Sequence, residues 1–179
     1  MTRTATTTVT LLVGAALLAI ASGCSDDPTK GYTLTSQYDR GVKTVSVPLW
    51  GRGKDVYRRG LEMRLTEAVI KRLELDTPYK VTDRRRADTE LSGTIERVSQ
   101  RVLSFNPDTG LPHEKEITLA VSFTWTDLRS GRVLARRRNF RETGSYIPPS
   151  PLGEDFFQGS EDAINRLARR IVEQLEADW

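Results

Sequence analysis

Few side chains in this sequence could carry out nucleophilic or metal chemistry. It has one cysteine, Cys24, and one histidine, His113. A single cysteine cannot close a disulfide within the chain, and a structural zinc site takes about four ligands, usually Cys and His. Cys24 could therefore be a nucleophile, a core residue or a lipid anchor more readily than a metal ligand. A catalytic thiol also needs a neighbouring base, and the spacing alone leaves a Cys24–His113 pair open.

The carboxylates and glycines form no recognisable catalytic pattern. Glu114 and Glu116 lie in or beside a polar, turn-rich stretch, where carboxylates are usually solvated. His113 is expected to be an exposed loop residue. Gly51 and Gly53 form a G-x-G before a predicted helix, without the third glycine or the lysine of phosphate-binding loops. We predict that the protein is not an enzyme and has no metal site and no cofactor.

Two runs of arginine are the candidate ligand-binding residues: Arg84, Arg85 and Arg86, and Arg136, Arg137 and Arg138. Guanidinium groups match the geometry of phosphate oxygens. The second run lies on a predicted strand, where consecutive side chains alternate, so its outer two members should share one face. The alternative for each arginine is a solvated surface that also protects a strand edge.

The residues before Cys24 are predicted to form a secretion signal. Residues 9–21 are apolar and uncharged, but a transmembrane helix needs roughly 20 residues. Small residues, Ala21, Ser22 and Gly23, then precede Cys24, and the chain becomes polar directly after it. This is the arrangement of a short h-region followed by a peptidase site.

The "ASGC" segment resembles the lipobox of bacterial lipoproteins, although Ala21 stands where leucine is usual. The resemblance implies that the Cys24 sulfur receives a diacylglyceryl group and that cleavage occurs just before it. Ser25 resembles the residue found in lipoproteins sorted to the outer membrane. We therefore expect a signal peptide over 1–23, a lipidated N-terminus and tether over 24–40, and one domain over 41–179. The alternative is a conventional signal peptide with a free Cys24.

Charge and length limit the function further. The formal net charge is +3, one unit of which comes from Arg3 in the predicted signal. So small a charge does not require nucleic-acid binding, and we predict none. Residues 41–179 are enough for one domain with a real core.

Periodicity predicts two helices. Over residues 56–75, apolar residues fall on one stripe: Tyr57, Leu61, Leu65, Ala68, Val69 and Leu73. A second stripe over residues 154–177 contains Phe157, Ile164, Leu167, Ala168, Ile171 and Leu175. Asp162 and Arg166 should pair one turn apart on its outer side.

Alternating patterns predict the strands. Residues 42–49 and 79–81 flank the first helix and should be parallel, as in a βαβ unit. A long strand over about 91–102 changes phase after Ile95, which indicates a bulge. Residues 116–127 place Ile117 to Trp125 on one face and hydroxyls on the other. A further strand begins at Val133.

The predicted order is β-α-β-β-β-β-α. Two amphipathic helices and a half-wet sheet bury one another if both helices pack on the same face. The predicted fold class is α/β, an α+β two-layer sandwich with a mixed, mostly antiparallel sheet of about four to five strands. Trp125 is expected in the core, and Trp50 either in the core or as an anchor for a partner.

Several phrases in this order resemble the lipopolysaccharide-assembly lipoprotein (LptE-like) family. They are "GYTL" at 31–34, "VKTVSVPLW" at 42–50, "YRRGLEMRLTEAVIKRL" at 57–73, "YKV" at 79–81, "ADTELSGTI" at 87–95 and the closing helix. Family members often have Gly-Tyr directly after the lipidated cysteine, whereas here residues 25–30 are inserted.

The resemblance implies a location and two partners. Such proteins are lipid-anchored at the periplasmic face of the outer membrane, where they plug and stabilise a β-barrel translocon (LptD-like) that delivers lipopolysaccharide. Some bind lipopolysaccharide directly, and the arginine runs are our candidates for that contact. The alternative is a lipid-anchored binding or assembly module of another cell-envelope system, because "ADTELSGTI" patterns occur in several envelope families.

Overall fold

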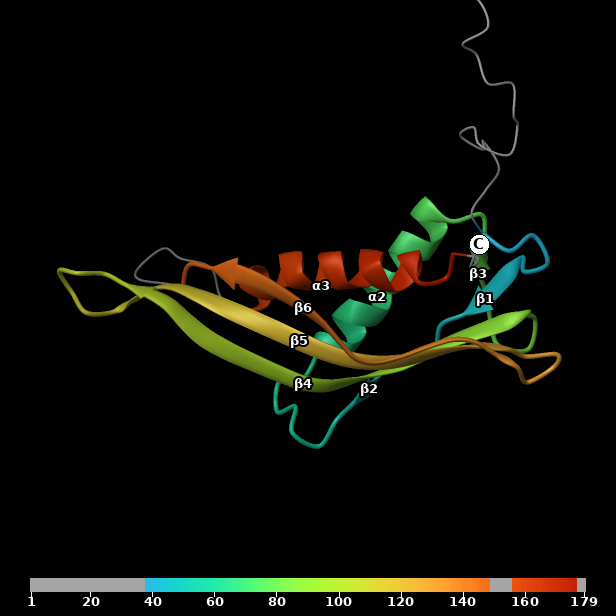
Figure 1. The fold of residues 1–179 in the computed structure, drawn as a ribbon, viewed down its shortest axis with the longest axis horizontal. Coiled ribbons are helices and arrows are strands. Elements are labelled where there is room, and N and C mark those ends of the chain that lie inside the picture. Colours follow the sequence, from blue (N-terminus) through green and yellow to red (C-terminus); the bar gives the residue numbers. More distant parts are fainter. Residues whose placement is uncertain (1–37, 149–155, 177–179) are drawn as a thin grey trace, which may run out of the picture. The chain divides into compact units, whose positions relative to one another are not determined.

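The computed structural model describes residues 38–148 and 156–176. Cys24, the predicted signal peptide and most of the predicted tether lie outside these residues. Within the described residues, six strands and two helices follow one another (Figure 1). They are β1 (Thr44–Ser46), β2 (Gly51–Arg52), α2 (Leu61–Asp76), β3 (Lys80–Val81), β4 (Thr89–Phe105), β5 (Pro112–Asp127), β6 (Val133–Tyr146) and α3 (Phe156–Glu173).

The strands form one mixed sheet in the order β3-β1-β4-β5-β6, with β2 also paired to β4. β1 is parallel to β3 and to β4, which confirms the predicted βαβ connection through α2. The long β4–β5 and β5–β6 ladders are antiparallel. The class and most of the order are therefore as predicted.

The short strand β2 was not among the predicted strands. It pairs in parallel with Thr94 and Ile95 of β4. Gly51 makes this approach possible, since a Cβ at that position would lie 2.9 Å from the Thr94 Oγ1 atom. The missing side chain, which favours a loop in sequence, here admits a neighbouring strand.

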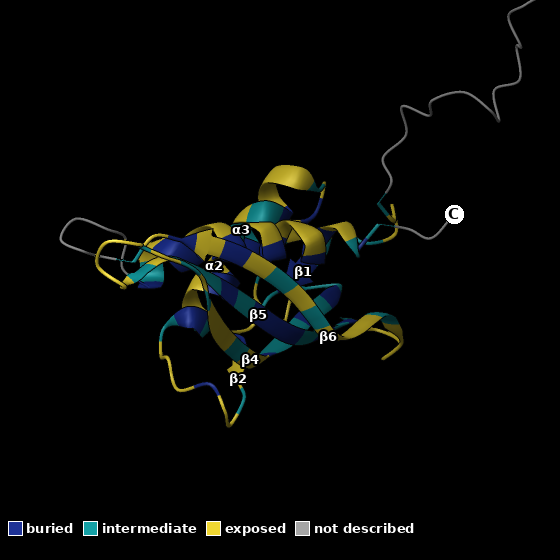
Figure 2. Ribbon diagram, turned by 60° about the vertical axis from the view of Figure 1, so that its left-hand side comes forward, coloured by how far each residue is buried: buried dark blue, intermediate teal, exposed yellow. Residues whose placement is uncertain are grey.

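Both helices cover the same face of the sheet (Figures 1 and 2). The side chains of β5 from Ile117 to Trp125 that face them are buried, as predicted. One small internal gap is bounded by side chains from α2, α3 and the sheet: Leu61, Leu65, Ile95, Leu119, Val121, Ile164 and Leu167. The two helices and the sheet thus share one core.

Trp50 belongs to this core. Its ring is 2% exposed and lies over Gly93, where a Cβ would approach the ring to 2.5 Å. The Trp50 amide donates to the Thr66 hydroxyl at 3.1 Å. Of the two roles expected for Trp50, core packing is the one that the structure supports.

The predicted helix boundaries need correction at the start of α2. The helix begins at Leu61, because Gly60 precedes it in the left-handed region with φ of 91°. Tyr57 therefore lies in a loop and is 86% exposed, so placing it on the buried stripe was wrong. The stripe predicted for the last helix packs on the core, but α3 ends at Glu173, so the buried Leu175 lies beyond the helix. The predicted Asp162–Arg166 pair is confirmed at 2.8 Å.

The bulge predicted after Ile95 is present. The β4–β5 register shifts between Ile95 and Arg97, so Val98 returns to the face that packs on the core.

No helix within residues 38–148 and 156–176 has both the length and the apolarity needed to cross a bilayer.

Candidate functional site

The face of the sheet turned away from both helices carries a band of hydroxyl groups. Ser92 pairs with Thr124, and Thr94 pairs with Ser122, across the β4–β5 ladder. These residues alternate with core residues such as Phe123, so their side chains point to the open side of the sheet. Sequence analysis predicted a wet face on β5 but did not include the β4 hydroxyls in a site.

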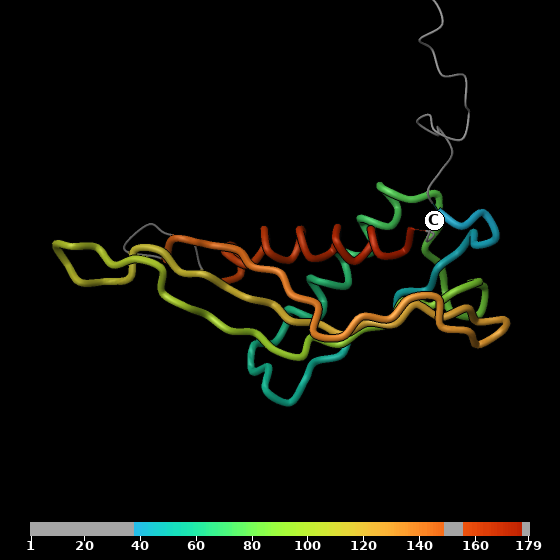
Figure 3. The backbone as a smooth tube through the Cα atoms, in the orientation of Figure 1, coloured from blue at the N-terminus to red at the C-terminus, as the bar shows by residue number. Residues whose placement is uncertain are grey.

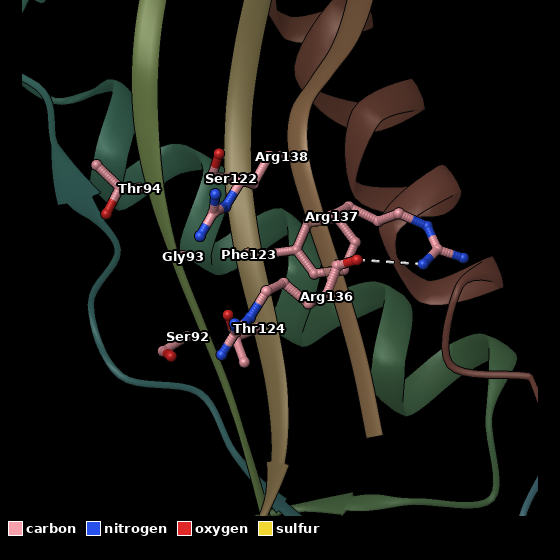
Figure 4. Close-up of a pocket in the computed structure, with 9 residues that line it drawn as sticks. All are labelled: Ser92, Gly93, Thr94, Ser122, Phe123, Thr124, Arg136, Arg137 and Arg138. Carbon is pink, nitrogen blue, oxygen red and sulfur yellow. Dashed lines mark hydrogen bonds between the residues drawn. The ribbon is translucent and has the colours of Figure 1, made fainter. Parts of the chain in front are cut away.

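The arginines of β6 border this band. Ser92, Thr94, Ser122, Thr124 and the residues from Arg136 to Arg138 line a shallow hollow of about 390 Å³ (Figure 4). Figure 4 shows Arg136 and Arg138 reaching across β5 towards the hydroxyls. We call this group, with Arg136 and Arg138 as its two cations, the arginine–hydroxyl hollow.

Arg137 points to the other side, as the alternation predicted. It pairs in register with the core residue Phe123, and its Nε donates to the Gln174 Oε1 atom at 2.8 Å. One of its terminal nitrogens also donates to the Arg136 carbonyl, at 3.2 Å. Arg137 therefore tethers β6 to the segment that follows α3, and its guanidinium is not directed into the hollow.

A bulge in β6 sets where the arginines end and the core resumes. Val121 pairs with Phe140 but Phe123 pairs with Arg137, so two residues, Arg138 and Asn139, oppose one residue of β5. Asn139 has φ of 52°, the left-handed conformation that Asn tolerates better than most residues. If the same residues formed a regular strand without the bulge, strict alternation would place Phe140 on the open face with Arg136.

The charges of the hollow are not neutralised locally. Within the part of the chain that the structure describes, neither Arg136 nor Arg138 has an ion-pair partner. Ser122 accepts a hydrogen bond from the Asn139 amide at 3.3 Å and still has its own proton to donate. Two guanidinium groups beside four hydroxyls can therefore bind a phosphate group through several hydrogen bonds at once.

The basic face continues along the sheet beyond the hollow. Arg97 of β4 and Arg141 of β6 both pair with Ala120, a β5 residue of the open face. The carboxylate of Glu116 on this face is neutralised by Arg101 at 3.0 Å. The alternation was visible in sequence, but the register that aligns these arginines was not.

The other arginine run lies in the turn between β3 and β4. Arg84 pairs with Glu90 at 3.1 Å and Arg86 with Asp83 at 3.0 Å. Glu90 is two residues from Ser92 on the same face of β4, so Arg84 is held beside the open face and not in the hollow. The structure does not combine the two runs into one site, and Arg84 and Arg86 meet carboxylates before any ligand.

Asp88 holds this turn against β1. One of its oxygens accepts hydrogen bonds from the Lys43 amide at 3.1 Å and the Thr44 amide at 3.0 Å, and from the Thr44 hydroxyl at 2.9 Å. Its other oxygen pairs with Arg129. The Lys43 amide, then the Thr44 hydroxyl and amide and Arg129, hold the pKa of this carboxyl below its usual value. The role is structural, since all of these partners are supplied by the chain.

No catalytic arrangement accompanies these features. His113 is exposed, as predicted, but it lies near the start of β5 and not in a loop, because β5 begins at Pro112. No group of three or more His, Cys, Asp or Glu side chains in residues 38–148 and 156–176 could hold a metal ion.

A second hollow lies between the helices on the opposite side of the molecule. It measures about 670 Å³ and includes Met63 and Lys71 of α2 and Phe157 and Asn165 of α3. The Arg64–Glu161 ion pair, at 3.2 Å, joins the two helices here. In contrast to the arginine–hydroxyl hollow, this groove has acidic as well as basic side chains in its lining.

Together, the described residues form a two-layer α/β sandwich with one open, arginine-rich sheet face. Residues 42–179 match the LptE family, described as "Lipopolysaccharide-assembly". The chain therefore belongs to the LptE lipopolysaccharide-assembly family. The family is one of non-enzymatic assembly lipoproteins, and the resemblance noted in the sequence is confirmed.

Three solved bacterial proteins illustrate what the chain is similar to. The hypothetical protein CT253 from Chlamydia trachomatis has 13% identity and a TM-score of 0.52; the superposition covers 75% of this chain and 95% of the CT253 chain. For the PelC dodecamer from Paraburkholderia phytofirmans, the identity is 16% and the TM-score 0.47, over 83% of this chain and 96% of the PelC chain. For the rare lipoprotein B from Shewanella oneidensis, the identity is 21% and the TM-score 0.44, over 73% of this chain and 92% of that protein's chain. No curated protein matches the chain. The likeness to CT253 concerns the fold alone.

Proposed function

We propose that this protein is an outer-membrane lipoprotein that partners and stabilises an LptD-like β-barrel translocon, and that it binds lipopolysaccharide on its open sheet face. Support for the barrel partner comes from the family match over residues 42–179. Support for the ligand comes from one observation, the pair of unneutralised arginines, Arg136 and Arg138, beside four hydroxyls.

The chemistry of the hollow suits the polar part of such a ligand. Lipopolysaccharide carries phosphates and acidic sugars, and charge-assisted hydrogen bonds from guanidinium to phosphate are stronger than neutral ones. Hydroxyls can donate to the same oxygens from β4 and β5. Because the hollow is shallow, the contact would position a headgroup and leave the rest of the ligand to a partner.

The membrane anchor is part of this proposal. Cys24 would be the first residue of the mature protein, with its sulfur in a thioether to diacylglycerol at the periplasmic face of the outer membrane. Mass spectrometry of protein extracted from the native membrane tests this directly. A retained Met1 or a free Cys24 thiol would contradict the anchor, whatever the outcome for the open face.

The ligand proposal is tested by titrating the purified protein with lipopolysaccharide and with the same material after phosphatase treatment. The double variant Arg136→Gln/Arg138→Gln should bind intact lipopolysaccharide about tenfold more weakly, a loss of about 1.4 kcal/mol. The matched control, Arg132→Gln/Arg169→Gln, removes the same charge from two exposed positions elsewhere. Equal weakening in both variants would mean that only net charge matters.

The assembly proposal has its own test. Depletion of the protein in its native host should reduce lipopolysaccharide at the cell surface and the amount of mature barrel. Unchanged surface lipopolysaccharide would instead support the alternative, a lipid-anchored module of another cell-envelope system.

A further inference from the structure

The end of the sheet formed by the β4–β5 turn carries three large apolar side chains in solvent. Leu103, Phe105 and Leu111 are 42%, 62% and 52% exposed. The hairpin extends beyond the end of β6 and the start of α3 (Figure 3), so no other described helix or strand covers its tip. Scattered single apolar residues are normal on a surface, but three on one hairpin end mark a contact region.

Hydrogen bonds within the turn hold these side chains in place. The Asn106 side-chain oxygen accepts from the amides of Asp108 at 2.9 Å and Thr109 at 3.1 Å. The Asn106 amide donates to the Leu111 carbonyl, and the Gly110 amide to the Asn106 carbonyl, each at 2.8 Å. A tip ordered before it binds loses little conformational entropy in the complex.

The strand register also changes beside the tip. It shifts between Val102 and Ser104, and again between Ser104 and Phe105. Such irregularities bend a strand and redirect its side chains, and they are common next to functional regions. Here they leave Leu103 unopposed by a β5 residue, and its side chain remains in solvent.

Charge distinguishes between the surfaces that could cover this tip. Arg101 and Glu116 neutralise each other in an ion pair. The remaining charges near the tip are two negative ones, on Asp108 and Glu114, and one positive one, on Lys115. The slight excess of acid repels an anionic lipid surface, so a membrane is the less suitable partner. An apolar recess on a protein, with a neutral or basic rim, is complementary to both the side chains and the charge.

Position favours the same occupant. Tyr38, where the described chain begins, bridges to Glu176 at the opposite end of this unit from the hairpin tip (Figure 3). β4 has 17 residues, so its ends are roughly 55 Å apart at about 3.3 Å per residue. A tether leading to an anchor at Cys24 would therefore start from the end of the domain that is far from the tip.

We propose that the β4–β5 tip docks in an apolar recess of the barrel partner, with Phe105 and Leu111 as its anchoring side chains. This inference rests on the proposed function for the identity of the occupant. Aromatic and large aliphatic side chains that become fully buried supply most of the energy at such contacts. The tip would then act as a second, apolar attachment point, separate from the arginine–hydroxyl hollow.

The experiment uses the full-length, lipidated protein expressed in its native host and purified with its barrel. In the variant Phe105→Ser/Leu111→Ser, we expect at least tenfold less barrel to be recovered at equal amounts of the lipoprotein. The matched control is Leu49→Ser/Leu75→Ser, because both leucines are 66% exposed and lie outside the hairpin. The control should retain the barrel, and both variants should keep the thermal unfolding midpoint of the wild type.

Each result separates the two proposals. Full recovery of the barrel with the tip variant, or equal loss with the control, overturns the docking role of the tip alone. No barrel with the wild type overturns both proposals. Flotation with phosphatidylglycerol vesicles is measured in a Cys24→Ser background, which removes the proposed lipid anchor. If the tip variant abolishes that flotation, or abolishes self-association in light scattering, while barrel recovery is unchanged, the occupant is a membrane or a second copy instead.

Discussion

The two arginine triplets of this protein have the same residues and different surroundings. Residues 84–86 lie in a turn, where two of the three arginines meet carboxylates within 3.1 Å. Residues 136–138 lie on a strand, where the pleat sends Arg137 towards α3 and leaves Arg136 and Arg138 over a row of hydroxyls. The difference shows that a run of charge becomes a candidate site only where its counter-charges are absent and other donors converge.

The largest expected effect concerns the platform beneath the second triplet. Gly93→Val would place a side chain where the Trp50 ring lies, since even a Cβ there would be 2.5 Å away. Trp50 is 2% exposed and its ring has no room to move freely, so we expect the free energy of unfolding to fall by about 3 kcal/mol or more. Urea unfolding measures it. A loss smaller than about 1 kcal/mol would mean that Trp50 can be displaced at little cost.

The next effect tests what holds the first triplet. Asp88→Ala removes the acceptor shared by Lys43, Thr44 and Arg129 and should lower the free energy of unfolding by about 2 kcal/mol at neutral pH. The folded-state pKa of Asp88 is lowered from 3.8. Its contribution is therefore full above the unfolded pKa and is lost as the pH falls through the folded one.

Urea unfolding of the wild type and the Asp88→Ala variant at pH 7 and at pH 3 checks this sign. The difference between them should be smaller in acid. A difference that grows in acid, or that does not change, would show that the carboxylate charge does not stabilise the turn.

A smaller effect tests the bulge that separates the second triplet from the core. In Asn139→Ala, an alanine must adopt the left-handed conformation, with φ of 52°, which asparagine tolerates better. The substitution also removes the side-chain oxygen that accepts a hydrogen bond from the Arg141 Nε at 2.9 Å. We expect a loss of about 1 kcal/mol in the free energy of unfolding. Asn139→Gly is the control, because glycine accepts this backbone conformation and should recover part of the loss.

The smallest effect compares the triplets directly. Removing all three charges in Arg84→Gln/Arg85→Gln/Arg86→Gln should change affinity for lipopolysaccharide by less than about twofold, or 0.4 kcal/mol. Removing two from the arginine–hydroxyl hollow should cost about tenfold. Titration at low salt is needed, since screening reduces the effect of exposed charges. A greater loss from the 84–86 variant would reverse the assignment of the site.

Much of the fold could be predicted because its strands and helices carry clear periodicity. The β5 pattern from Ile117 to Trp125, the phase change after Ile95 and the βαβ unit around α2 were all correct. The errors fall where a glycine changes the backbone locally. Gly60 starts α2 five residues later than predicted and exposes Tyr57, and Gly51 admits β2 beside Thr94.

The candidate site was less predictable. The six arginines were visible in sequence, and so was the alternation of the second triplet. Which hydroxyls stand beside Arg136 depends on the β4–β5–β6 register, and that register contains several shifts. A shift of one residue moves every side chain to the other face, so small local events determine what gathers on the open side.

Residue type and periodicity were therefore enough to predict a two-layer sandwich. The family, and the expectation of an anchor at Cys24, came from segments that resemble known sequences. These properties depend on neighbours in the chain, whose spacing the backbone geometry sets. The arginine–hydroxyl hollow, the pairing of Arg84 and Arg86 and the exposed hairpin tip depend on contacts between residues that are far apart in sequence. Bulges, strand register and packing decide which of these residues come into contact. Such contacts exist only once the strands and helices are assembled.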